Sequence, residues 1–93
     1  MNITFSPLFR KFVKKQVPPF QLAIKDEVDR VCEEPTIGEE KVGDLAGYRV
    51  HKFKFHTQEY LVAYLRREKT IAFFMIGIHE NFYRNLKAYI GGK

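Results

Sequence analysis

The fold is decided by one segment, residues 48–78, which reads YRVHKFKFHTQEYLVAYLRREKTIAFFMIGI. From Val50 to His56 the sequence alternates with a period of two, which is typical of a half-buried strand. One face of this strand carries His51, Phe53 and Phe55, and the other carries Lys52, Lys54 and His56. Thr57–Glu59 predicts a tight turn into a second strand, Tyr60–Arg66. The segment therefore begins with a β-hairpin.

The same segment ends in a third predicted strand. Arg67–Lys69 is the expected turn, and Thr70–Ile78 is almost entirely apolar. Because a continuous apolar strand is buried on both faces, we expect it in the centre of the sheet. Gly77 predicts a bend near its end.

The chain before this segment predicts a strand and two helices. Ile3–Phe5 is β-prone, and Ser6 followed by Pro7 is typical of a helix start, since the serine hydroxyl can cap and proline fits the first turn. The prolines at residues 18–19 end this helix and open the next one, because proline is tolerated only in a first turn. The second helix is predicted to end near Cys32.

Two further segments complete the predicted fold. Glu33–Gly47 has no apolar period and several glycines, so we expect a loop. Phe82 and Leu86 have helical spacing and predict a short last helix that stops at Gly91–Gly92. The predicted class is α+β, in the order β-α-α-β-β-β-α, with residues 1–93 as a single domain. An N-terminal helical hairpin is expected on one face of a small antiparallel sheet, with a short C-terminal helix.

The composition excludes several classes of protein. A chain of 93 residues allows one domain. Its single cysteine, Cys32, excludes an internal disulfide framework and a cysteine-based zinc site. The longest apolar run, Ile71–Ile78, is much shorter than the roughly 20 residues that span a bilayer, and Met1–Val13 lacks the apolar block of a signal peptide. We expect a small soluble domain in the cytoplasm, with no membrane partner.

The charges are segregated along the chain. Residues 1–47 hold seven basic and eight acidic residues, a net charge of −1, whereas residues 48–93 hold nine basic and three acidic residues, a net charge of +6. A basic C-terminal half indicates a surface that faces a polyanion such as nucleic acid. The alternative is a solvated, slightly basic surface, which many small domains have.

The order of elements and three motifs resemble the RelE/ParE superfamily of bacterial toxins. The motifs are DLAGYRV at residues 44–50, YLVAY at residues 60–64 and HENFY at residues 79–83. The resemblance covers essentially the whole chain. Members of this superfamily either cleave messenger RNA, usually on the ribosome, or poison DNA gyrase, and each is held inactive by an antitoxin.

This resemblance implies four catalytic residues. Lys52 and Lys54 match a lysine pair on the second strand of RelE-like members. His79 and Tyr83 match the YafQ-like branch, in which a histidine ends the fourth strand and an aromatic residue follows four positions later. With no metal, RNA cleavage needs a base for the ribose 2′-OH, cations for the developing charge and an acid for the 5′-oxygen. No carboxylate cluster with metal-ligand spacing lies in the basic half, so no metal or other cofactor is expected.

One position departs from the superfamily pattern. Leu61 stands where RelE-like members have an arginine, so that role is vacant or is filled by Arg66 or His56. These two residues, with Arg84 and Lys87 on the last helix, are the expected RNA-binding set. If Tyr60 shares the face of Lys52 and Lys54, the alternation of the strand adds Tyr60, Tyr64 and Arg66 to that face.

Each candidate also has a structural interpretation. Lys52 and Lys54 could be the solvated side of an amphipathic strand. His79 could be a hydrogen-bonded structural histidine or a cap of the last helix, and Tyr83 could pack on the sheet edge instead of stacking on a base. His56 is better explained as a solvated turn residue. His51 faces the apolar side and is expected to be structural.

The sequence thus predicts the toxin of a type II toxin–antitoxin pair, acting as a metal-independent, ribosome-dependent mRNA endoribonuclease. The alternatives are a ParE-like inhibitor of DNA gyrase and a degenerate domain that survives as an antitoxin-binding corepressor. The expected partners are the cognate antitoxin and mRNA on the ribosome, with operator DNA contacted only through the antitoxin. We expect an acidic, partly helical antitoxin segment over the two-helix side that reaches the face of Lys52, Lys54 and His79.

Overall fold

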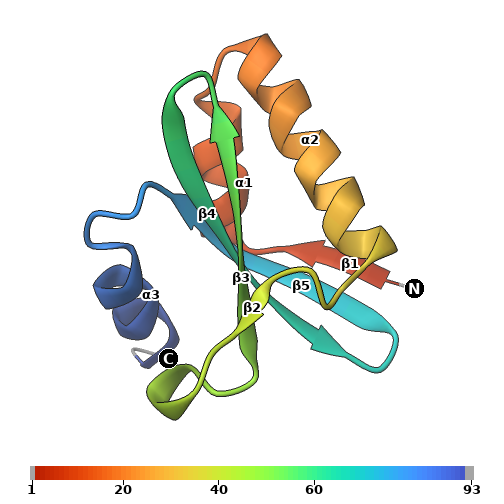
Figure 1. Cartoon of the computed structure of the whole chain (residues 1–93), viewed down its shortest axis with the longest axis vertical. Helices are drawn as coiled ribbons and strands as arrows, with labels where there is room; N and C mark the ends of the chain where they lie inside the picture. Colours follow the sequence, from red (N-terminus) through yellow and green to blue (C-terminus); the bar gives the residue numbers. More distant parts are fainter. Residues whose placement is uncertain (1, 92–93) are drawn as a thin grey trace.

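A computed structural model describes residues 2–91 of the chain (Figure 1). The elements are, in order, β1 (Asn2–Phe5), α1 (Pro7–Lys14), α2 (Pro18–Glu33), β2 (Glu39–Glu40), the 3₁₀-helix η1 (Gly43–Leu45), β3 (Tyr48–Phe55), β4 (Gln58–Arg67), β5 (Thr70–Gly77) and α3 (Phe82–Gly91). This is the predicted α+β class. Gly92, part of the predicted helix stop, lies outside the described residues. Within residues 2–91, no helix has the length and hydropathy needed to cross a bilayer.

The five strands form one mixed sheet in the order β1-β5-β4-β3-β2. β2 to β5 pair antiparallel, but β1 pairs with β5 in parallel. The expected antiparallel sheet is therefore confirmed for β2 to β5, and the parallel β1 is the one exception. The chain leaves β1 through both helices, and such a long crossover allows a parallel partner. β4 is the middle strand, so the expectation that Thr70–Ile78 lies in the centre of the sheet is wrong by one strand. β5 is still flanked by β1 and β4, which explains its apolar sequence.

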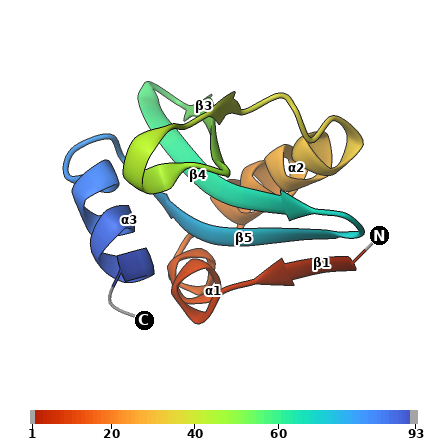
Figure 2. The same cartoon turned by 90° about the horizontal axis from the view of Figure 1, so that it is seen from below.

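The helical hairpin begins as its sequence predicts. The Ser6 hydroxyl accepts a hydrogen bond from the Phe9 backbone N–H at 3.0 Å, and Pro7 occupies the first turn of α1. Pro18 occupies the same place in α2. In Figure 1, α2 and α3 flank the sheet on opposite sides, and in Figure 2 α3 lies beside α1, on the side of α1 away from β1.

Each face of the sheet has its own apolar core. The core under the hairpin, here the hairpin-face core, contains the buried side chains of Phe9, Phe20, Ile24, Val28, Val31, Phe53, Val62, Tyr64, Ile71, Phe73 and Ile76. The core under α3, here the α3-face core, contains Leu45, Val50, Leu61, Ala63, Met75, Phe82 and Leu86. The α3-face core is smaller because one short helix covers that face, and part of β3 stays exposed there.

Two predicted boundaries are wrong. The expected loop at residues 33–47 contains β2 and η1, whose short polar sequences carry no apolar period. The β3–β4 turn is His56 and Thr57, one residue shorter than predicted, and His56 adopts a left-handed φ of 56° to close it. A register change of one residue moves every side chain of the following strand to the opposite face. The side chains of β4 therefore lie on the opposite faces of the sheet from those predicted.

Candidate functional site

Lys52 and Lys54 are exposed on the face of β3 that α3 leaves open. His51 and Phe53 alternate with these lysines along the strand, point to the other face and are buried. His51 Nε2 lies 2.7 Å from a carboxylate oxygen of Glu27 on α2, as expected for a structural histidine. The predicted alternation of β3 is confirmed, and it directs both lysine side chains away from the hairpin-face core.

The strand register brings the end of β5 to the level of these lysines. Lys52 pairs with Leu61 on β4, and Leu61 pairs with Gly77 on β5, so the three lie in one row across the sheet. Two strand spacings separate Lys52 from Gly77, about 10 Å between Cα atoms. β3 and β5 run in the same direction, so His79, two residues after Gly77, lies at the end of the sheet where Lys54 projects.

His79 and Tyr83 form an aromatic pair at this end. Their ring centroids are 5.8 Å apart with a T-shaped interplanar angle of 76°. The turn into α3 fixes His79, because its carbonyl accepts the Phe82 backbone N–H at 3.0 Å and Asn81 adopts a left-handed φ of 63°. His79 is exposed, whereas Tyr83 is half-buried against the α3-face core. The spacing of four residues places both rings together, as the sequence motif suggests.

Lys41 joins this site and was missed in the sequence. Its Nζ lies 4.9 Å from the centroid of the Tyr83 ring and 2.9 Å from a carboxylate oxygen of Glu39. The hydrogen bond with Glu39 is the largest cause of a raised pKa of Lys41, and Tyr83 adds to it. Lys41 in turn lowers the pKa of Glu39, and Lys52 contributes to the same effect. These four side chains therefore form one electrostatic cluster.

Glu59 was also missed, since the sequence assigned it to a turn. It lies on β4 directly opposite Lys54, on the α3 face by alternation from the buried Leu61. Lys41 and Glu39 were missed because their segment was predicted to be a loop. Its sequence has no alternation of apolar and polar residues from which a strand face could be assigned. Only the register of β2 and β4 assigns these three residues to a face.

Some predicted residues are not brought to this site. Tyr60 and Tyr64 lie on the opposite face, against the hairpin-face core, because the shorter turn shifts the register. Arg66 follows Tyr64 by two residues on β4 and pairs with Ile71, near the other end of the sheet. The same-face expectation for these three residues is wrong.

The remaining predicted RNA-binding residues are exposed around the site. His56 lies in the β3–β4 turn with its ring 4.3 Å from the Phe55 ring. Arg84 donates a hydrogen bond to the Asn81 side chain at 2.8 Å, which holds its guanidinium near the start of α3. Lys87 is exposed one turn after Tyr83 on α3. Leu61 is fully buried in the α3-face core, so no polar group replaces the superfamily arginine from that position.

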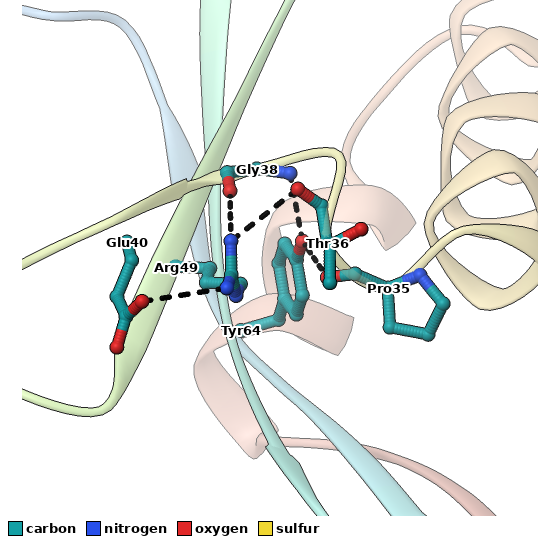
Figure 3. A network of polar contacts seen from close by, with 6 residues as sticks. All are labelled: Pro35, Thr36, Gly38, Glu40, Arg49 and Tyr64. Atoms are coloured by element: carbon teal, nitrogen blue, oxygen red, sulfur yellow. Dashed lines mark hydrogen bonds and ion pairs between the residues drawn. The ribbon is translucent and has the colours of Figure 1, made fainter.

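A buried tyrosine holds the segment that carries Lys41. The Tyr64 hydroxyl donates to the Pro35 carbonyl at 2.6 Å and accepts from the Gly38 backbone N–H at 2.9 Å (Figure 3). A Cβ on Gly38 would lie 2.7 Å from that hydroxyl, so only glycine fits there. Burial raises the pKa of Tyr64, with the Gly38 bond opposing it.

Arg49 secures the same segment from the side. Its guanidinium donates to the Gly38 carbonyl at 2.7 Å and the Thr36 carbonyl at 3.3 Å, and it forms an ion pair with Glu40 at 3.4 Å (Figure 3). This network anchors β2 to β3. It thereby fixes the position from which Glu39 and Lys41 reach the site.

The site combines the ammonium groups of Lys41, Lys52 and Lys54 with the carboxylates of Glu39 and Glu59. Within residues 2–91, no group of three or more His, Cys, Asp and Glu side chains is arranged to hold a metal ion. The exposed imidazole of His79 contacts the Tyr83 ring, and both lie at the same end of the sheet as the exposed ammonium groups of Lys52 and Lys54. These groups can bind a phosphate, transfer a proton and stack on a planar ring.

Comparisons with solved structures agree with this fold. The chain is similar to the isolated E. coli RelE toxin, with a TM-score of 0.65 and 17% identity over 99% of this chain and 98% of that chain. It is similar to a chain of the intact E. coli RelBE toxin–antitoxin complex, with a TM-score of 0.65 and 18% identity over 83% of this chain and 94% of that chain. At these identities the likeness establishes the fold alone. No curated protein matches the chain.

A family model decides the assignment. The model of the ParE-like toxin of type II bacterial toxin–antitoxin systems matches residues 3–87, which is nearly the whole chain. The match covers both cores and the end of the sheet that carries His79 and Tyr83. The chain therefore belongs to the ParE-like toxins of type II bacterial toxin–antitoxin systems.

Proposed function

We propose that this toxin is a metal-independent endoribonuclease that cleaves mRNA on the ribosome. One observation carries the proposal: an exposed histidine, His79, lies at the end of the sheet and on the face where Lys52 and Lys54 are exposed. Cleavage of a phosphodiester without a metal requires a group that transfers a proton and cations that stabilise the developing negative charge. The RelE fold is consistent with it.

The proposed reaction is an attack of the ribose 2′-oxygen on the adjacent phosphorus. A base takes the 2′-OH proton, the P–O bond to the 5′-oxygen breaks, and an acid protonates that oxygen, which leaves a 2′,3′-cyclic phosphate and a 5′-hydroxyl. His79 transfers a proton in this step, because an imidazole can both accept and donate a proton. Lys52 and Lys54 stabilise the charge on the phosphorane, and Tyr83 aligns a base by stacking.

The RNA strand extends beyond the scissile phosphate in this proposal. His56 lies at the β3–β4 turn, next to the end of the sheet, and Arg84 and Lys87 lie along α3. They would contact neighbouring phosphates, which adds salt-dependent affinity. Arg66 lies near the opposite end of β4 and would contact only a more distant nucleotide.

The cognate antitoxin is the second proposed partner. A groove of about 590 Å³ runs between α1 and α3; its lining includes the apolar side chains of Leu8, Phe12, Ile78 and Phe82 and the basic ones of Lys11 and Lys15. Leu8 and Ile78 are exposed hydrophobic residues. An acidic amphipathic segment would bury its apolar side there and pair with the lysines. From this groove such a segment would reach the face of His79.

Expression of the toxin without antitoxin tests the nuclease. Wild type should arrest bacterial growth and produce cleaved mRNA ends in primer extension, whereas His79→Ala should do neither at equal protein levels. Equal arrest and equal cleavage by both proteins would exclude a catalytic role of His79.

A second function, inhibition of DNA gyrase, has its own support. The matching family model is described as ParE-like, and the buried Leu61 leaves the superfamily arginine without a replacement at that position. Purified toxin should leave gyrase supercoiling unchanged if our proposal is correct. Inhibited supercoiling with intact mRNA would favour the gyrase function, and loss of both activities with retained antitoxin binding would favour the corepressor.

A further inference from the structure

A carboxylate occupies a position beside the site where an anionic substrate would bind. Glu39 pairs with Val50 across β2 and β3, and the Lys41 backbone N–H donates to the Tyr48 carbonyl at 2.9 Å, so the ladder continues past β2. Residues two apart on a strand share a face. Glu39 and Lys41 therefore both project onto the α3 face, the face of the buried Val50.

The ammonium of Lys41 is turned toward the protein. The Lys41 side chain is 21% exposed, although it follows an edge strand, whereas its partner Glu39 is 68% exposed. Lysine heads normally extend into water. Here the head lies on the Tyr83 ring at 4.9 Å and contacts the Glu39 carboxylate at 2.9 Å. The cation is thus held in place, while the anion beside it faces solvent.

Glu39 is influenced by two cations of the site. Its carboxylate is hydrogen-bonded to Lys41, and Lys52 also favours its charged form. A carboxylate and a phosphodiester are both anions that present two oxygens to a cation. Because Glu39 is exposed and an exposed ion pair is weak, a phosphate can displace it and take its place beside Lys41.

We propose that Lys41 binds a phosphodiester of the RNA substrate and that Glu39 occupies this phosphate position in the free toxin. The inference rests on the proposed RNA-cleaving function and adds to it a binding residue and an internal competitor. Tyr83 connects the two, since its ring contacts both Lys41 and His79. The phosphate held by Lys41 is then next to the nucleotide that stacks on Tyr83.

Binding of an uncleavable RNA tests this inference. The probe is a 2′-O-methylated trinucleotide, whose dissociation constant is measured by NMR from the ring signals of Tyr83 at low salt. Lys41→Gln should weaken binding about tenfold, and Glu39→Gln should strengthen it about threefold or more, as expected for gaining or losing one charge-assisted contact. The matched control is Glu33→Gln, which changes the net charge equally but removes an exposed carboxylate at the end of α2. It should leave binding unchanged.

A double variant tests whether Glu39 acts through its contact with Lys41 or through the net charge of the protein. If Glu39 competes at Lys41, Glu39→Gln should give a smaller gain in the Lys41→Gln background than in wild type. Lys41→Arg should restore binding, and thermal unfolding verifies that each variant is folded. Equal effects of Glu39→Gln and Glu33→Gln, wild-type affinity of Lys41→Gln, or no binding of the probe would each overturn the inference.

The outcome also separates this inference from the proposed function. Predicted affinities without mRNA cleavage on ribosomes would refute the nuclease and leave the phosphate site. Normal cleavage with unchanged affinities in the Lys41 and Glu39 variants would refute only the phosphate site.

Discussion

The two faces of β3 differ in how completely their polar groups are paired. On the hairpin face, His51 is buried and bonded to Glu27, and Phe53 packs in the core. On the α3 face, Lys52 and Lys54 alternate with these residues and are exposed. Two helices cover the hairpin face, whereas one short helix covers only part of the α3 face. The same strand therefore supports stability on one side and offers cations to a ligand on the other.

This comparison predicts that substitutions on the α3 face change activity and those on the hairpin face change stability. The largest effect is expected for His79→Ala. Loss of a proton-transfer group should lower the rate of mRNA cleavage about 10²- to 10⁴-fold, measured with purified toxin and translating ribosomes. The midpoint of thermal unfolding should stay the same, since His79 is exposed. A marked drop in that midpoint with little change in rate would contradict the comparison, because His79 would then contribute to stability and not to catalysis.

The lysine pair should have the next largest effect. Lys52→Ala with Lys54→Ala should lower the cleavage rate about 10- to 100-fold, because charge-assisted contacts to the phosphate are lost. The matched control is Lys14→Ala with Lys15→Ala, which removes the same charge around the end of α1. If the control lowers the rate as much as the pair does, the effect comes from net charge and not from the site.

Tyr64→Phe should lower the free energy of unfolding by about 1–2 kcal/mol, because the Gly38 N–H loses its acceptor and the Pro35 carbonyl its donor. The measurement is urea unfolding followed by circular dichroism. Binding of the uncleavable RNA should also weaken, since Tyr64 holds the segment that carries Lys41. Unchanged stability would show that the network in Figure 3 does not anchor β2.

The smallest effect concerns alkaline pH. Burial raises the pKa of Tyr64 above its ordinary value of 10.0. The folded state then retains a proton that the unfolded state releases, so this contribution to stability is complete below pH 10 and is lost as the pH rises through the folded pKa. Wild type should lose more stability than Tyr64→Phe between pH 9 and pH 11, in steps measured by thermal unfolding. Parallel losses in the two proteins would contradict this role of Tyr64.

Much of the fold follows from local sequence patterns. Ser6 and Pro7 start α1, the alternation of residues 50–56 separates the two faces of β3, and the apolar run of β5 indicates an interior strand. Periodicity works here because each element is long enough to bury one side. The four-residue spacing of His79 and Tyr83 follows from the sequence, and the structure shows their two rings in contact.

The rest depends on contacts between distant residues. β2 has two residues and is held by the side chains of Arg49 and Tyr64, so the sequence of residues 39–40 gives no sign of a strand. A turn of two residues instead of three shifts the register, which moves Tyr60 to the hairpin face. Lys41 reaches the site only through these long-range contacts. Local patterns therefore predict the frame of the site but not its full set of charges.

The chemistry of the RNA product tests the central proposal most directly. Purified toxin is incubated with translating ribosomes, and the new ends of the mRNA are analysed. We predict 2′,3′-cyclic phosphate and 5′-hydroxyl ends, absent with His79→Ala and absent when the attacking nucleotide lacks its 2′-OH. Ends with a 3′-hydroxyl and a 5′-phosphate, or intact mRNA together with inhibited gyrase, would contradict the account.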